Sequence, residues 1–154
     1  MNYDAAGAIQ SLLEDNWSSS NTDGKTPLIQ EVYEVKEISI AIKDRILIYN
    51  TPGNKKSFNG VGSSNFKGDW PVTIDLRSSY QPNKDSTLDT LSTVTGHEHI
   101  TKMMLEVERI IKAKKGEPGN GFEVIMPMTD RDLSDRRKKL YRWVYEVMLK
   151  ITNY

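Results

Sequence analysis

A strict alternation of apolar and polar residues between positions 70 and 77 constrains this chain more than any other feature. The apolar positions are Trp70, Val72, Ile74 and Leu76. A period of two places them on one face of a strand, and that face must be covered by another layer of structure. Pro71 has no amide hydrogen to donate, so we expect it at the first residues of the strand or on an edge strand.

A long amphipathic helix supplies a covering layer. Its apolar residues recur at three- and four-residue spacing: Ile100, Met103, Met104, Val107, Ile110 and Ile111. Thr95 and Glu98 have the spacing of a capping box at its start. At about 1.5 Å per residue, a helix of about 20 residues reaches about 30 Å, enough to cross a four-strand sheet. A shorter helix with the same spacing is predicted between Asp4, its N-cap, and Trp17.

Further segments have the composition of strands. Leu28 to Val35, Ile38 to Ile42 and Ile46 to Tyr49 leave no room for a helix between them, so we expect an antiparallel meander. After a turn, four apolar residues are expected to face one way along another strand: Phe122, Val124, Met126 and Met128. The apolar residues of the segment 140–152 fit both the period of a strand and the period of a helix. Its aromatic and β-branched residues favour a long strand.

The length of 154 residues predicts a single domain, residues 1–154. The elements predict an α+β fold: a mostly antiparallel sheet with a short N-terminal helix and one long helix packed on one face. Polar stretches near 50–69 and 78–94 are predicted to be long loops. The second face of the sheet then meets solvent or a neighbouring copy.

Composition excludes several classes of protein. The 21 basic and 21 acidic side chains cancel, which argues against a surface shaped as a whole for a polyanion. The absence of cysteine excludes disulfides, thiolate metal sites, iron–sulfur clusters and a cysteine nucleophile. No run approaches the roughly 18 apolar residues of a membrane span, and the N-terminus lacks the pattern of a signal peptide. We therefore expect a protein of intracellular origin, or a virion part, without membrane contact.

The search for catalytic chemistry finds little. His97 and His99 are two positions apart, about 200° around a helix, so their rings diverge and do not form a metal site. We expect exposed imidazoles beside a capping Glu98. The chain has no nucleophile elbow, P-loop or dinucleotide fingerprint, and the spacing of its aspartates does not demand Mg²⁺. The prediction is a protein that is not an enzyme and has no catalytic residue, metal ligand or cofactor.

Three groups of residues are candidates for contacts with partners. Asp75 and Arg77 share the polar face of one strand and suit cross-strand or intersubunit pairing. The basic run Arg136, Arg137, Lys138 and Lys139 is either a solvated connection, a phosphate contact or an intersubunit salt bridge. The alternating aromatics Tyr141, Trp143 and Tyr145 either stack single-stranded bases or belong to the core or an oligomer interface.

The order of these elements resembles the tail terminator, or tail-completion, proteins at the neck of tailed viruses. Short phrases are similar to small proteins of archaeal tailed viruses and proviruses. They are Glu14-Asp15-Asn16-Trp17, Ser20-Asn21-Thr22-Asp23-Gly24, Val72 to Ser78, and Asp132-Leu133-Ser134-Asp135 leading to Leu140-Tyr141-Arg142. The resemblance covers nearly the whole chain.

The resemblance implies a virion structural protein that forms a homohexameric ring and closes the tail tube at the head–tail joint. Its implied partners are further copies of itself, the tail tube protein and the connector or neck proteins, in a virion assembled in the host cytoplasm. Asp75, Arg77, Trp143 and Tyr145 are then expected at the subunit interface. The basic run 136–139 is expected to line the lumen and touch passing DNA.

Two other hypotheses compete with this one. A small α+β nucleic-acid-binding module would use the basic run 136–139 and the aromatic strand 141–145. A metal-dependent nuclease would use the aspartates.

Overall fold

The structure is a computed structural model that describes residues 4–32, 44–50, 55–58, 66–78, 96–116, 122–134 and 141–151. The helices are α1 (Ala5–Asn16), the 3₁₀ turn η1 (Ser19–Asn21) and α2 (Gly96–Lys114). The strands are β1 (Leu28–Glu31), β2 (Arg45–Asn50), β3 (Lys55–Phe58), β4 (Phe66–Ser78), β5 (Val124–Asp132) and β6 (Tyr141–Ile151).

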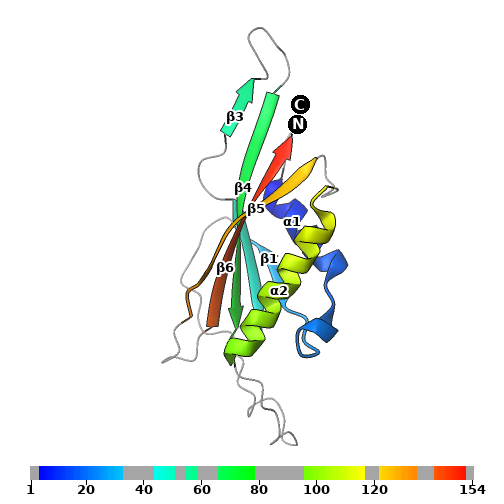
Figure 1. Cartoon of the computed structure of the whole chain (residues 1–154), viewed down its shortest axis with the longest axis vertical. Coiled ribbons are helices and arrows are strands. Elements are labelled where there is room, and N and C mark those ends of the chain that lie inside the picture. Colours follow the sequence, from blue (N-terminus) through cyan, green and yellow to red (C-terminus); the bar gives the residue numbers. More distant parts are fainter. Residues whose placement is uncertain are drawn as a thin grey trace, which may run out of the picture.

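The strands form one sheet in the order β1-β2-β4-β6-β5, and β3 also pairs with β4. All pairs are antiparallel except β1 with β2. Both helices lie on the same side of this sheet (Figure 1). The predicted α+β class, the mostly antiparallel sheet and the packing of both helices on one face are confirmed.

The meander predicted for residues 28–49 is wrong in one respect, because β1 and β2 run parallel. A parallel pair needs a crossover of about a dozen residues. Residues 32–44 provide that length, whereas the prediction had placed a further strand, Ile38 to Ile42, within them. The expected strand Ile38 to Ile42 lies outside the described residues.

The loop predicted near 50–69 is also partly wrong. It contains β3 and the first residues of β4, which pair from Lys55 with Asp69 to Phe58 with Phe66. The composition did not predict this hairpin, because its Lys, Ser, Gly and Asn residues show no alternation of apolar and polar positions. Most of the second predicted loop, residues 79–95, lies outside the described part of the chain.

Pro71 lies inside the central strand β4, and the expectation of a strand start or an edge strand is wrong. On one side of β4, β2 ends where Asn50 pairs with Val72, and β3 begins where Lys55 pairs with Asp69. Among the described strands, Pro71 therefore falls between these two partners and pairs with Met148 on β6 alone. A residue without an amide hydrogen is accommodated at such a break in the ladder.

The core lies between the sheet and the two helices. Helix α1 packs over β1, β2 and β4, and α2 packs over β4, β5 and β6. The alternating residues of β4 and the stripe of α2 are buried, as their spacing predicts. Each fully buried aliphatic side chain of this kind stabilises the fold by about 1.5–3 kcal/mol. The largest include Ile9, Leu13, Ile46, Ile48, Ile74, Leu76, Ile100, Met103, Ile110 and Ile111.

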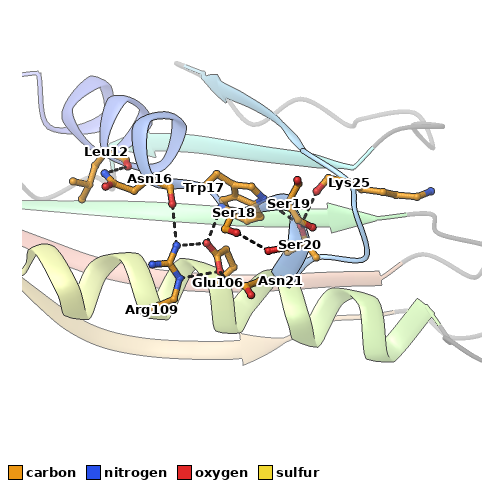
Figure 2. Close-up of polar contacts among 11 residues, drawn as sticks. Leu12, Asn16, Trp17, Ser18, Ser19, Ser20, Asn21, Lys25, Glu106 and Arg109 are labelled. Carbon is orange, nitrogen blue, oxygen red and sulfur yellow. Dashed lines mark hydrogen bonds and ion pairs between the residues drawn. The ribbon is translucent and has the colours of Figure 1, made fainter.

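A buried carboxylate on α2 fixes the connection that follows α1 (Figure 2). Glu106 is 2% exposed and accepts hydrogen bonds from the Ser18 amide at 3.0 Å and from Asn21 Nδ2 at 2.8 Å. Arg109 pairs with the same carboxylate and also donates to the carbonyl of Asn16 at 2.9 Å. One ion pair therefore anchors both the end of α1 and the turn η1 to the long helix.

His99, two helical turns before Glu106, is fully buried, and the expectation of an exposed imidazole is wrong. Its Nδ1 lies 2.8 Å from Asp23 Oδ2, and its Nε2 lies 2.5 Å from Asp44 Oδ2. Asp44 also accepts from Ser78 Oγ at 2.7 Å, and Lys102 Nζ donates to Asp23 at 2.6 Å. The imidazole thereby joins α2 to the residue before β2 and to the turn before β1.

Two carboxylate partners require that both ring nitrogens donate, so His99 is an imidazolium. Burial disfavours this charge, but the hydrogen bonds and charges of Asp44 and Asp23 outweigh it and raise the pKa of His99 above its ordinary value. A group whose pKa is raised by folding stabilises the folded state while it is protonated.

We expect the free energy of unfolding to be highest in mildly acidic solution and to fall with rising pH. The contribution of His99 is complete below about pH 6.5 and is lost as the pH passes the raised folded-state pKa. Replacing His99→Gln removes the charged partner of the buried Asp44 carboxylate and one of the two charged partners of Asp23, and lowers the free energy of unfolding by about 3–5 kcal/mol near pH 6. Urea denaturation over several pH values checks both effects, and an unchanged pH slope in the variant contradicts the assignment.

Candidate assembly surface

The face of the sheet turned away from the helices, here called the open face, carries the candidate site. Residues paired across neighbouring strands point to the same side, so the open face is built of cross-strand rows. In order along β4, these rows are Asp69–Lys150–Val124, then Pro71–Met148–Met126, then Tyr49–Thr73–Glu146–Thr129, then Leu47–Asp75–Val144–Arg131, and finally Arg45–Arg77–Arg142. Apolar residues therefore gather toward one end of the open face, beside Asp69 and Lys150, and arginines lie at the other end.

The apolar end lies on β5, the outermost described strand on its side of the sheet. Val124 is 41% exposed and Met126 is 44% exposed, and Met148 of β6 beside them is half-buried. We call Val124, Met126, Met148 and Pro71 the apolar patch. Exposed apolar side chains that gather on one surface are typical of an interaction site.

The prediction that Phe122, Val124, Met126 and Met128 face one way is wrong. Phe122 is buried in the core, where its ring meets that of Trp70 edge to face with centroids 5.7 Å apart. Ile125 supplies the core contact of β5, so the alternation turns Val124 and Met126 outward. A β-bulge between Pro127 and Thr129 then interrupts the alternation at Met128.

Pro127 and the bulge also disturb the row of backbone hydrogen-bonding groups along the edge of β5. Pro127 has no amide hydrogen, and the bulge at Met128 breaks the even spacing of backbone groups. Both features are known to protect edge strands from adding a further strand. The side chains of the apolar patch, rather than the backbone edge, are therefore the groups available for contact.

A pocket of about 210 Å³ lies beside the bulge, between α2 and β5. Burial, and then the negative charges of Glu108 and Asp130, raise the pKa of Tyr145 to about 12, so its phenol stays neutral. The lining residues are Glu108, Pro127, Met128, Thr129, Asp130 and Tyr145. The pocket is on the helix side of the sheet and is separate from the apolar patch.

Asp75 and Arg77 share the open face, as predicted. The Asp75 carboxylate is fully buried and accepts from Arg142 Nε at 3.0 Å, from Arg142 Nη2 at 2.9 Å and from Arg77 Nη2 at 3.0 Å. This is the cross-strand pairing that the sequence suggested. The hydrogen bonds to Asp75 raise the pKa of Arg142 above its ordinary value and outweigh burial, which lowers it.

The other candidate residues are placed differently. Trp143 packs against the core and donates from its Nε1 to Asp130 at 3.0 Å. Tyr145 is 6% exposed and belongs to the core, so the aromatic rings face the helix layer instead of forming an open stacking platform. The basic run Arg136, Arg137, Lys138 and Lys139 lies outside the described residues.

No family model matches this chain, and no curated protein gives a significant match. Among the described residues, no group of three or more His, Asp or Glu side chains has the arrangement of a metal site. Neither of the two described α-helices is long and apolar enough to cross a membrane.

Removing the Asp75 charge is expected to destabilise the sheet. Asp75→Asn keeps the side-chain volume but leaves Arg77 and Arg142 without their counterion, which lowers the free energy of unfolding by about 3–5 kcal/mol. The matched control is Asp15→Asn, at an exposed position on α1. It is expected to change the free energy of unfolding by less than about 0.5 kcal/mol. Equal values for the two variants in chemical denaturation would contradict a structural role for the Asp75 charge.

Proposed function

We propose that this chain is a structural assembly protein that forms a homo-oligomeric ring, similar to the tail terminators at the neck of tailed viruses. The observation that carries the proposal is the exposed apolar patch on β5. Its occupant is a second copy of the chain, and the completed ring would close a tail tube and meet the connector. The ring is a hexamer in the family that the sequence resembles.

The two outer strands support a head-to-tail contact between copies. On β1, at the opposite side of the sheet, Leu28 is 45% exposed and pairs with Arg45, so it also belongs to the open face. The two edges carry different residues, and the contact joins the β5 edge of one copy to the β1 edge of the next. A contact between unlike surfaces propagates from copy to copy and closes into a ring when the rotation allows it.

The mass of the protein in solution tests the ring. We expect light scattering to give a single oligomer of several subunits, and negative-stain images of the same peak to give closed rings. Met126→Glu places a charge in the apolar patch and is expected to yield monomers. Leu105→Glu is the control, because Leu105 is 52% exposed on α2, in the helix layer and not on the open face, and this variant should keep the oligomer. A monomeric wild-type protein at all concentrations would reject the proposal.

Mixing two variants tests the head-to-tail geometry. Met126→Glu damages only the β5 edge, and Leu28→Glu damages only the β1 edge, so each variant alone is expected to be monomeric. A mixture retains one intact pair of edges and should form a one-to-one dimer that cannot grow. A contact between two β5 edges predicts that Leu28→Glu still associates with itself and that the mixture contains no mixed dimer of the two variants. Either result would exclude the head-to-tail arrangement.

A further inference from the structure

The basic end of the open face carries three arginines side by side on adjacent strands. Arg45 of β2 pairs with Arg77 of β4, which pairs with Arg142 of β6. We call these residues the arginine row. Neighbouring strands are about 4.8 Å apart, so the three side chains start within about 10 Å of one another. Like charges directly opposite each other destabilise a sheet, so such a row requires compensation.

Asp75 provides only part of that compensation. Its carboxylate takes hydrogen bonds from Arg77 and Arg142, as described above. Within the described residues, Arg45 has no carboxylate partner. The arginine row therefore combines three guanidinium charges with one carboxylate and retains an excess of positive charge.

Two hydrogen-bond donors in the arginine row have no acceptor among the residues that the structure describes. The Nε atoms of Arg45 and Arg77 are buried, and neither has a partner within the described part of the chain. Buried polar groups are almost always hydrogen-bonded, and unsatisfied ones call for a ligand or water that completes the site. Arg77 keeps 13% of its side chain exposed and Arg142 keeps 30%, so the row is open to solvent at this end.

We propose that the arginine row is a binding site for a phosphate group. Guanidinium groups form forked, charge-assisted hydrogen bonds with oxyanions, and phosphate offers acceptor oxygens to more than one of them at once. Asp75 holds Arg77 and Arg142 in place from one side, while the Arg45 guanidinium, which has no carboxylate partner among the described residues, remains for the ligand. This site does not include any residue of the apolar patch.

Pyrophosphate is the probe for this site, and calorimetric titration in chloride buffer is the measurement. We expect saturable binding with one site per chain. Arg45→Gln is expected to weaken it by about tenfold or more, since one charge-assisted set of hydrogen bonds is lost. Arg45→Lys keeps the charge but lacks the forked donor groups. Its affinity for pyrophosphate should lie between that of the wild type and that of Arg45→Gln. Lys112→Gln removes the same charge from an exposed position on α2 and should bind like the wild type.

Arg45 is the informative position because its removal leaves Asp75 paired with Arg77 and Arg142. Arg45→Gln should therefore unfold at the same temperature as the wild type or higher in chloride, and should lose the thermal stabilisation that pyrophosphate gives the wild type. Absence of pyrophosphate binding by the wild type would overturn the proposal. The proposal would also be overturned if Arg45→Gln bound pyrophosphate as tightly as the wild type. An equal loss of affinity in Lys112→Gln would overturn it too, because it would indicate diffuse charge attraction.

Two phosphate sources are separated by a second titration with a short oligothymidylate. Tighter binding of the oligonucleotide than of pyrophosphate, lost in Arg45→Gln, would identify a nucleic-acid backbone as the ligand. Binding of pyrophosphate alone would identify a small phosphorylated ligand. Because Met126→Glu is distant from the arginine row, the monomeric variant should bind pyrophosphate as the wild type does, which keeps this test independent of the ring.

Discussion

The antiparallel ladder between β4 and β6 determines both faces of the molecule. It runs from Gly68 with Ile151 to Ser78 with Tyr141 without a register shift. A slip by one residue would move Tyr145 and Val147 out of the core and turn Arg142 toward the helices, because side chains alternate along a strand. Every surface discussed above, the apolar patch as well as the arginine row, exists only in this register.

Helix α2 carries two buried ionic residues on the side that meets the N-terminal segment. His99 holds Asp23 and Asp44, and Glu106 holds the turn after α1. Apolar packing alone would allow the helix to slide along the sheet, since neighbouring aliphatic contacts are similar in energy. Breaking a buried ion pair is strongly unfavourable, so these contacts favour one position of the helix over its neighbours.

Periodic residues were predicted well, and residues joined only by the tertiary fold were not. The stripe of α2, the alternation of β4 and the strand at Tyr141–Ile151 followed from spacing and residue type. The partners of His99 lie 76 and 55 positions away in the sequence, so no local pattern predicts them. Arg45 joins Arg77 and Arg142 only through the strand order, which the sequence did not provide. On β5 the core residue is Ile125 and not its neighbours Val124 and Met126, and the bulge that interrupts the alternation at Met128 has no clear sequence signal.

The ribbon formed by β3 and the start of β4 lies at one end of the sheet (Figure 1). Phe66 and Lys67 pair with β3 alone, since the ladder with β6 begins at Gly68. No helix that is described packs on β3. Elements with few packing contacts open at a lower free energy than the core does. The amide hydrogens of the ribbon are therefore expected to exchange with solvent sooner than those of β4 from Val72 onward. Binding of a neighbouring molecule to the ribbon would slow the exchange of these amides.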